Sequence, residues 1–280
     1  MKDIFYLSNK CRFCQSEELE LVLPLVPSPM CDKYLHKKKF QEIFPLDLFL
    51  CLDCGLSQVI CVVDPEYIYI DYIPGIYHAS SGLINHFKNY ADDALNKIDD
   101  IKLPTILDIG SNEGILLNHF KARGSTVLGV EPSKEISEIA NSSGIKTLTT
   151  YFNYDTAAQI KNKYGLFDII TINNLFANID NVIDFIKALK TTLSSNGLIV
   201  IESAYLGNML KNNMFDFIYH EHLSCITIVP LEKLFNKYGM KLVDLKVISP
   251  KGGSMRYYFS HNNSIRGETK EVEYYRNIEI

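Results

Sequence analysis

Residues 105–202 alternate short apolar runs with longer amphipathic stretches, and no other feature of the sequence restricts the fold as strongly. The apolar runs, each the length of a β-strand, are residues 105–109, 126–130, 145–149, 167–172 and 198–202. The stretches between them include apolar residues at helical spacing and glycines where helices would end, such as Gly124 and Gly144. Strands joined by helices of this length lie parallel in one sheet. The sequence therefore predicts an α/β fold with a Rossmann-like, doubly wound sheet.

The same pattern predicts three parts of the chain. Residues 1–65 hold most of the seven cysteines, lack helical periodicity and are expected to form a small module that needs a metal to fold. Residues 66–205 contain the sheet domain. Residues 206–280 carry a helical stretch near 230–238 and strand-like runs at 242–248 and 255–260, and are expected to form a partial C-terminal α/β segment.

Composition excludes several classes of function. The net charge is −5 and the pI about 5.8, so the chain has no overall basic field for a nucleic acid partner. The N-terminus MKDIFYLSNK lacks the apolar core of a signal peptide, and no run of 18 apolar residues occurs. We therefore expect a cytoplasmic protein that does not cross a membrane. No sequence pattern sets its oligomeric state.

Two C-x-x-C pairs, separated by 36 residues, predict a metal site in the N-terminal module. They are Cys11 with Cys14 and Cys51 with Cys54. Two such turns can place four thiolates around one Zn²⁺, and four cysteine ligands leave no open position for catalysis. The alternatives are buried apolar cysteines or redox-active pairs. Packing is the expected role of Cys31, Cys61 and Cys225.

A glycine-containing loop after the first predicted strand indicates the cofactor. The run from Asp108 to Gly114 reads D-x-G-x-x-x-G, and Glu131 ends the second strand 23 residues after Asp108. A carboxylate at that place can accept hydrogen bonds from both ribose hydroxyls. The loop lacks the G-x-G spacing of nicotinamide sites, and its acidic residues suit S-adenosylmethionine better than a pyrophosphate. The residues expected to bind this cofactor are Asp108, Gly110, Ser111, Asn112, Gly114, Glu131, Asn173 and Asn174.

Two further motifs lie beyond the fifth predicted strand. Tyr219-His220-Glu221-His222 follows it, and ligands of open α/β sheets bind at the carboxyl ends of the strands. A histidine there is suited to proton abstraction near neutral pH, although a second metal site or two structural histidines are alternatives. The run from Gly252 to Arg256 could form an anion-binding nest, and a simple turn is the alternative.

These motifs together resemble those of the bacterial sugar C-methyltransferases, which add methyl groups to nucleotide-linked ketosugars. The matching elements, in the family's order, are C-R-x-C, C-x-x-C-G-L-x-Q, I-G-S-N-x-G, G-V-E-P-S, Y-H-E-H and G-G-S-x-R, over residues 11 to about 260. The resemblance implies a class I methyltransferase sheet. The family continues more than a hundred residues past G-G-S-x-R, so the resemblance leads us to expect a shortened C-terminal domain.

The resemblance also implies roles for individual residues. His222 would be the general base, with Tyr219 and Glu221 holding or polarising the substrate, and the zinc cysteines would be structural. The residues implied on the substrate side are Tyr72, Tyr77, His220, Gly252, Gly253, Ser254 and Arg256.

The expected reaction is S-adenosylmethionine-dependent C-methylation of a nucleotide-linked ketosugar through His-assisted enolisation. Methylation of a hydroxyl on a sugar or another small polar acceptor is one alternative. A non-catalytic scaffold that binds zinc and S-adenosylmethionine is the other.

Overall fold

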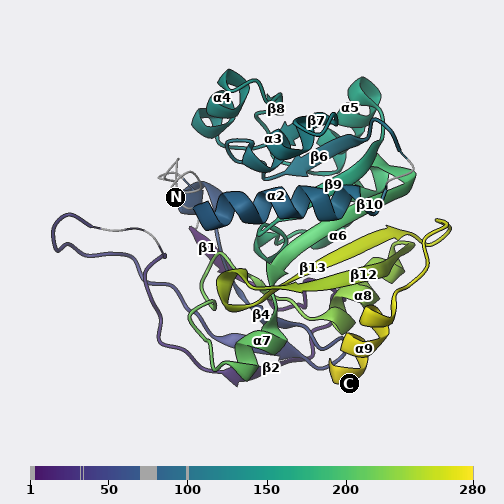
Figure 1. Ribbon diagram of the computed structural model, residues 1–280. Helices are drawn as coiled ribbons and strands as arrows, with labels where there is room; N and C mark the ends of the chain where they lie inside the picture. Colours follow the sequence, from purple (N-terminus) through teal and green to yellow (C-terminus); the bar gives the residue numbers. More distant parts are fainter. Residues whose placement is uncertain (1–3, 32, 34, 70–80, 99–100, 280) are drawn as a thin grey trace.

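The computed structural model describes residues 4–31, 33, 35–69, 81–98 and 101–279. Its centre is a mixed sheet that, over these residues, has seven strands in the order β12-β13-β10-β9-β6-β7-β8 (Figure 1). The strands are β6 (Thr105–Ile109), β7 (Thr126–Val130), β8 (Thr147–Leu148), β9 (Phe167–Asn173), β10 (Leu193–Ala204), β12 (Met240–Ile248) and β13 (Ser254–His261). β6 to β10 pair in parallel, and β13 pairs antiparallel with both β10 and β12. The predicted α/β fold is confirmed.

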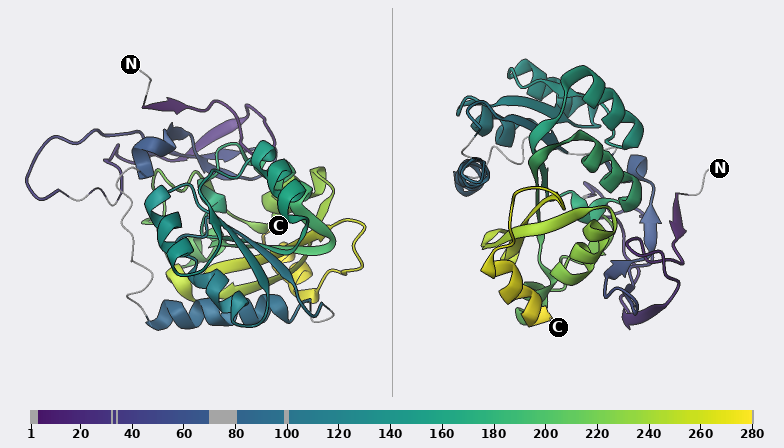
Figure 2. Two further views of the ribbon diagram at one scale, coloured as in Figure 1. Left: turned by 90° about the horizontal axis from the view of Figure 1, so that it is seen from above. Right: turned by 90° about the vertical axis from the view of Figure 1, so that its right-hand side faces the viewer.

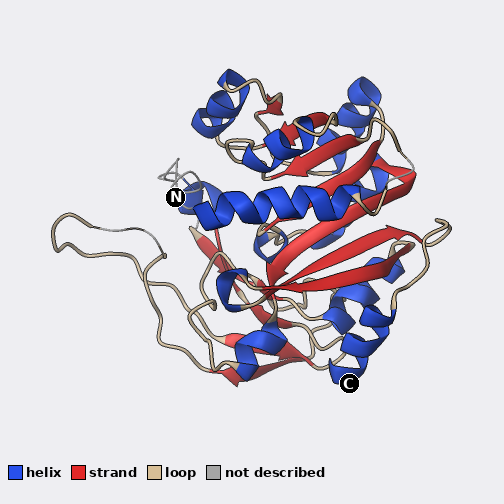
Figure 3. Ribbon diagram, viewed as in Figure 1, coloured by secondary structure: helices blue, strands red, loops and turns tan. Residues whose placement is uncertain are grey.

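Helices cover both faces of this sheet because its central strands are apolar on both sides. One face packs against α2 (Ser81–Leu95), α3 (Ile115–Lys121) and α4 (Lys134–Ser142). The other packs against α5 (Tyr154–Tyr164), α6 (Val182–Thr192), α8 (Ile228–Lys237) and α9 (Lys270–Glu279). Successive side chains of a strand point to opposite faces of the sheet. In β10, Leu198 and Val200 therefore face the layer with α2, whereas Ile199 and Ile201 face the layer with α6 and α8. Figure 3 shows the two helical layers around the strands.

Local signals explain where several helices begin. Asn153 caps α5, because its side chain accepts the Thr156 amide hydrogen bond at 2.9 Å while the Thr156 hydroxyl accepts from the Asn153 amide. α3 begins after Gly114, which has a left-handed backbone with φ 80°. A Cβ atom at Gly114 would come within 2.8 Å of the Ile145 side chain, so only glycine fits this turn.

The segment beyond residue 205, predicted as a partial C-terminal α/β segment, packs as part of the central sheet. β12 and β13 from this segment complete the central sheet at the β10 edge. The tail of the described chain forms α9, where the Glu279 carboxylate accepts hydrogen bonds from the Ile228 and Val229 amides at the start of α8. The short helices η2 (Phe176–Asn178), α7 (Leu206–Lys211) and η3 (Pro250–Gly252) lie in loops.

The N-terminal module lies beside the large sheet (Figure 2). It contains β1 (Phe5–Leu7), β2 (Leu19–Leu23), β3 (Leu48–Cys51), β4 (Ser57–Val59) and β5 (Cys61–Val63), and it is followed by α1 (Pro65–Tyr69). β1 pairs with β5, and β2, β3 and β4 form a sheet whose fourth described strand is β11 (Ser224–Cys225). A strand from the far end of the chain therefore belongs to the N-terminal sheet.

Candidate active site

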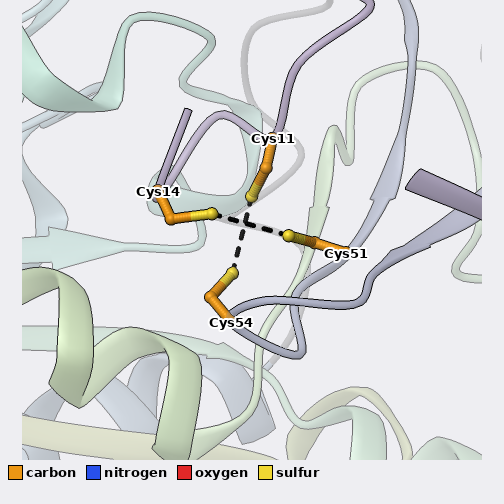
Figure 4. Close-up of side chains that lie close together, drawn as sticks. All are labelled: Cys11, Cys14, Cys51 and Cys54. Carbon is orange, nitrogen blue, oxygen red and sulfur yellow. Dashed lines mark hydrogen bonds between the residues drawn. The ribbon is translucent and has the colours of Figure 1, made fainter. Parts of the chain in front are cut away.

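The four predicted zinc cysteines come together in the N-terminal module. Their sulfur atoms all lie within 4.8 Å of one another and point toward a common centre (Figure 4). The Sγ atoms of Cys11 and Cys54 are 3.5 Å apart, as are those of Cys14 and Cys51. A tetrahedral site with Zn–S bonds of about 2.3 Å requires sulfur separations of about 3.8 Å, so the four sulfurs fit zinc.

The other cysteines play no part in this cluster. Cys61 and Cys225 are buried in the core of the module, as a packing role predicts. Cys31 is exposed, so packing is the wrong role for it.

The predicted cofactor loop lies at the carboxyl edge of the parallel strands. Gly110 and Ser111 follow β6, and both amides donate to the Val130 carbonyl of the neighbouring strand. Glu131 follows β7, and its carboxylate accepts the Asn112 amide at 3.1 Å and the Ser133 amide at 3.0 Å. The loop is therefore folded around the carboxylate of Glu131. Burial raises the pKa of this carboxyl despite the two amide donors.

Asp108, at the start of the loop, is a buried carboxyl group, and its predicted contact with the cofactor stays untested. It is 3 % exposed, and its Oδ1 atom accepts a 2.6 Å hydrogen bond from Thr171 on β9. Burial raises the pKa of Asp108 to about 7, with a smaller contribution from the charge of Glu131. The Asp108 carboxyl is thus held by Thr171 on the neighbouring strand, and burial favours its protonated form.

Asn173 and Asn174 also lie at the carboxyl edge. The Asn174 amide donates to the Glu202 carbonyl at 2.8 Å, and its side-chain amide donates to Asn173 Oδ1 at 2.7 Å. Asn174 has a left-handed φ of 53°, which turns the chain away from β9. Both asparagines therefore border the same edge as the cofactor loop.

His222 forms a dyad with Tyr219. The Tyr219 hydroxyl is 2.8 Å from His222 Nε2, and His222 Nδ1 is 2.9 Å from the Phe217 carbonyl oxygen. Because a carbonyl only accepts, Nδ1 carries the proton, and Nε2 is a lone pair that accepts from the Tyr219 hydroxyl. Burial lowers the pKa of His222 to about 4, and the nearby Lys251 cation contributes to this lowering. The imidazole is therefore neutral above that pH.

Comparisons with known proteins identify the family. Residues 83–245 match the family described as "Methyltransferase domain", and residues 11–69 match the family described as "Putative zinc binding domain". The chain belongs to the methyltransferase domain family. This membership confirms the predicted methyltransferase domain, and the second match together with the sulfur geometry confirms the zinc module.

Curated relatives include enzymes that methylate carbon and oxygen. The C-methyltransferase NovU of Streptomyces niveus is 28% identical over 258 residues, which is 91% of this chain and 61% of the relative. This methyltransferase therefore spans less than two thirds of the length of that relative. The ubiquinone biosynthesis O-methyltransferase of Vibrio parahaemolyticus is 24% identical over 189 residues, which cover 64% of this chain and 79% of the relative.

Solved structures show the same fold at low sequence identity. The plantazolicin methyltransferase BpumL, in complex with a pentazolic desmethylPZN analog and SAH, is 13% identical with a TM-score of 0.51. The match covers 66% of this chain and 87% of that one. The PH0226 protein of Pyrococcus horikoshii OT3 is 12% identical with a TM-score of 0.51, over 71% of this chain and 99% of that one.

Arg256, which was predicted on the substrate side, is surrounded by acidic and aromatic side chains. Arg256 is 1 % exposed, and its guanidinium donates to Glu202 at 2.8 and 3.0 Å and to Asp93 at 2.9 Å. The guanidinium also stacks 3.9 Å from the centre of the Tyr90 ring. His86 contacts the other oxygen of Glu202 at 2.6 Å. Arg256 thus pairs with the buried Glu202 and the partly exposed Asp93, and its predicted contact with substrate stays untested.

The glycine pair lies in a packed turn, and the predicted substrate contacts of Gly252, Gly253 and Ser254 stay untested. The Gly253 amide and the Ser254 hydroxyl both donate to the Pro250 carbonyl, at 3.1 Å each. A Cβ atom on Gly252 would come within 2.2 Å of Met214, and one on Gly253 within 2.5 Å of Asn208. The glycines are therefore needed for packing against the chain after β10. Lys251 beside them has a left-handed φ of 56°, a conformation that costs energy in a residue other than glycine.

His220 also has partners away from the dyad. It is 1 % exposed, and its Nε2 atom lies 3.3 Å and 3.2 Å from the carbonyl oxygens of Phe44 and Pro45 in the N-terminal module. This geometry favours a structural role. A substrate contact by His220 stays an untested prediction, as do the roles of Tyr219, Glu221 and His222. Tyr72 and Tyr77 lie outside the described residues.

Sequence reasoning missed Tyr69, at the end of α1. Its hydroxyl accepts a 3.1 Å hydrogen bond from the Asn178 side chain. Burial raises its pKa most, and the charges of Glu221 and Glu131 raise it further. Tyr69 therefore lies within electrostatic reach of both the dyad segment and the cofactor loop. The only signal in the sequence is the cluster of tyrosines from 67 to 77, which does not indicate which one enters the site.

A surface hollow of about 590 Å³ lies between α5 and α6, away from the candidate site. The residues that line it are Tyr154, Asp184, Lys187, Lys190 and Thr191, and none of them belongs to the candidate site.

Within the described part of the chain, no helix has the length and apolar character needed to cross a membrane.

Proposed function

We propose that this methyltransferase adds a methyl group to a carbon atom of a nucleotide-linked ketosugar, with His222 as the general base. The observation that carries the proposal is the neutral His222 ring, whose Nε2 lone pair accepts a hydrogen bond from Tyr219 at 2.8 Å. The similarity to a C-methyltransferase over 91% of the chain supports it, as do the motifs shared with sugar C-methyltransferases.

The loop at the carboxyl edge fits the methyl donor. Glu131 has carboxylate lone pairs beyond the two that accept backbone amides, and these suit ribose hydroxyls. Gly110, Ser111, Asn112 and Gly114 would border the remainder of the donor, with Asn173 and Asn174 on the side of β9. When bound, S-adenosylmethionine supplies a methyl group that is already activated by its sulfonium.

The residues of the dyad would generate the carbon nucleophile. When a substrate carbonyl takes over the Tyr219 hydrogen bond, the His222 lone pair is released. His222 Nε2 then accepts the proton from the carbon next to the keto group, and the electron pair moves onto the carbonyl oxygen as an enolate. The Tyr219 hydroxyl stabilises that oxygen, and Nδ1 keeps its hydrogen bond to the Phe217 carbonyl, so the resulting imidazolium stays oriented.

The charge of the substrate would adjust the strength of the base. In the free protein, burial and then Lys251 lower the pKa of His222 to about 4, which makes it a weak base. A diphosphate that pairs with Lys251 would remove that repulsion, and its own negative charge would favour the imidazolium. The pKa of His222 would therefore rise toward neutrality when an anionic sugar nucleotide binds. This coupling favours a charged substrate over a neutral acceptor.

We also propose that three segments of the chain have different roles. Residues 1–65 form the zinc module and residues 66–205 contain the donor site. Residues 206–280 supply the acceptor side through the segment at 219–222 and Lys251, in addition to the two strands that complete the sheet.

Methyl transfer to a hydroxyl is the second candidate, because the ubiquinone biosynthesis relatives are O-methyltransferases. The same base would deprotonate a hydroxyl group. A product assay with ¹³C-methyl-labelled S-adenosylmethionine and a panel of nucleotide ketosugars separates the two. We expect an NMR signal in which the labelled methyl couples to a sugar carbon. A methyl bonded to oxygen would establish the second candidate and refute the first.

The matched variants for that assay are His222→Asn and Tyr154→Phe. Loss of a general base lowers turnover by about 10²- to 10⁴-fold, whereas Tyr154 lies exposed on α5 away from the site. Calorimetry with S-adenosylhomocysteine should show nearly equal affinity for both variants and the unaltered chain. Full turnover by His222→Asn would remove His222 from the role of base.

A further inference from the structure

The segment that includes His222 is attached to the N-terminal module on both sides. After it, β11 pairs antiparallel with β4, where Ser224 lies opposite Gln58 and Cys225 opposite Ser57. Before it, Ile218 is 7% exposed and belongs to the hydrophobic core of the module, as Cys225 does. The His220 ring, hydrogen-bonded to the Phe44 and Pro45 carbonyls, is a third attachment. The position of His222 therefore depends on a part of the chain more than 150 residues away.

Arg12 joins the zinc-binding turn to this segment. It lies between the zinc ligands Cys11 and Cys14 and is 4 % exposed. Its Nη1 atom donates to the carbonyl of Leu223, the residue directly after His222, and its Nη2 atom donates to the Val59 carbonyl at 2.9 Å. The same Leu223 carbonyl accepts the Val59 amide at 3.0 Å.

Gln58 fixes Arg12 from the opposite side. Its Oε1 atom accepts from the Arg12 backbone amide and from Nη1, at 3.1 Å each, while its side-chain amide donates to the Lys10 carbonyl at 3.2 Å. Asp180 approaches Arg12 Nε at 3.8 Å and offsets its charge. A buried guanidinium is costly unless it is paired and hydrogen-bonded, so this network holds Arg12 in one orientation.

We propose that Arg12 is a positioning residue for His222, and that metal binding by the four cysteines sets the position of Arg12. The proposal rests on the proposed role of His222 as base. Metal binding orders the Cys11–Cys14 turn, and the ordered turn fixes the orientation of the Arg12 guanidinium. The guanidinium then holds the Leu223 carbonyl, directly after His222, by a hydrogen bond. The donor loop at 108–114 is held by β6 and β7 and has no hydrogen bond to Arg12 among the described residues. Loss of the Arg12 contact should therefore affect the acceptor side and leave the donor side unchanged.

The test compares Arg12→Ala, Arg12→Lys and the control Lys10→Ala in the full zinc-loaded chain. Lys10 is next to the same turn, but its side chain makes an exposed ion pair with Glu17. Zinc content, calorimetry with S-adenosylhomocysteine and amide hydrogen exchange are measured for each variant. We expect Arg12→Ala to keep its zinc and its donor affinity, while amides in 218–225 exchange at least ~10-fold faster and those in 108–114 do not change.

The Arg12→Lys variant and steady-state kinetics distinguish a positioning role of Arg12 from a general effect on stability. Arg12→Lys keeps one donor and should recover part of the protection, and Lys10→Ala should match the unaltered chain. Arg12→Ala should lose turnover by about 10-fold or more with little change in the KM for the donor. Unchanged protection of 218–225, or an equal loss in 108–114, would overturn the proposal.

Zinc removal provides a second route if Arg12→Ala fails to fold. In the unaltered chain, a chelator should accelerate amide hydrogen exchange in residues 218–225 and leave that in residues 108–114 unchanged. Any other pattern of exchange counts against the proposal. Hydrogen exchange does not depend on turnover. If no ketosugar is methylated, the proposed function fails, while the exchange pattern still decides whether Arg12 holds this segment.

Discussion

Buried ionisable side chains at the carboxyl edge of the sheet have environments that set their protonation. Asp108 has a pKa raised to about 7 by burial, while His222 has a pKa lowered to about 4 by the same cause. Each group is thereby shifted toward its neutral form, because a low-dielectric interior disfavours charge of either sign. A neutral imidazole suits a base, and a neutral carboxyl at Asp108 lessens the repulsion with Glu131.

The protonation of Asp108 predicts a pH-dependent effect of Asp108→Asn on the free protein. The folded state keeps this proton up to pH of about 7, whereas the unfolded state loses it near 3.8. The stability from the protonated group is thus full below about pH 4 and is lost as pH rises through 7. The substituted asparagine would be neutral at every pH, and its side-chain oxygen can still accept from Thr171.

The variant should therefore unfold at a higher urea concentration than the unaltered chain, with a greater advantage at pH 8.5 than at pH 5.5. The gain at pH 8.5 should be on the order of a few kcal/mol. The control is Asp155→Asn, which replaces an exposed carboxylate on α5. A gain of equal size at both pH values would show that Asp108 is ionised throughout.

At the scale of elements, α9 acts as a cap for α8. Glu279 accepts from the Ile228 and Val229 amides at 2.9 Å each and from the Tyr205 hydroxyl at 2.8 Å. Carboxylates at a helix N-terminus satisfy amides that have no partner within the helix and interact favourably with its dipole. Glu279 of α9 thereby connects the start of α8 with Tyr205, which directly follows β10.

Glu279→Ala should lower the free energy of unfolding by about 1–2 kcal/mol. It removes the acceptor of two helix amides and of a tyrosine hydroxyl. Glu273→Ala, at an exposed position of α9, should change stability by less than about 0.5 kcal/mol. Urea denaturation followed by circular dichroism measures both. Equal effects of the two variants would show that the cap contributes nothing.

The elements also show what the sequence can predict. The five parallel strands were expected from apolar runs because each buried strand has a local signature. α9 was missed because its apolar residues are few, and Val272 alone is buried among its described residues. The insertion of β13 beside β10 depends on pairing between residues about fifty positions apart, such as Glu202 with Arg256. Such pairing is determined by tertiary packing and has no local pattern.

The same reasoning applies to the site. The zinc cysteines and the loop around Glu131 were predictable because their spacing alone specifies the geometry. The pairing of Arg256 with Glu202 and Asp93 could not be predicted, because a sequence does not show which carboxylates come to lie beside a guanidinium. Tyr69 could not be distinguished from its neighbouring tyrosines for a similar reason.

At the scale of the whole molecule, the zinc module and the large sheet share a hydrophobic core. Cys11, Phe13 and Leu56 lie in the same buried cluster as Ile172 and Phe176 at the end of β9. The Phe13 and Phe176 rings meet edge to face at 6.2 Å. The module is thus packed on the sheet, and its second core includes Leu206 and Met209 from the chain after β10.

Zinc removal should therefore uncouple the module from the sheet. The zinc-loaded chain is expected to melt in one cooperative transition, and the chelated chain in two, with the module unfolding first. Differential scanning calorimetry with and without chelator tests this expectation. Cys51→Ser should behave like the chelated chain, and Cys31→Ser, whose cysteine is exposed and outside the cluster, like the zinc-loaded one. A single unshifted transition after chelation would show that the metal contributes nothing to folding.

Solvent exchange at the acceptor carbon tests the central claim most directly. The unaltered chain and His222→Asn are incubated in deuterated water with a nucleotide ketosugar and S-adenosylhomocysteine, so that enolisation proceeds without methyl transfer. Mass spectrometry should show one deuterium entering the sugar with the unaltered chain, and a rate lower by about 10²-fold or more with His222→Asn. Equal rates of exchange in the two proteins would contradict the assignment of His222 as the base.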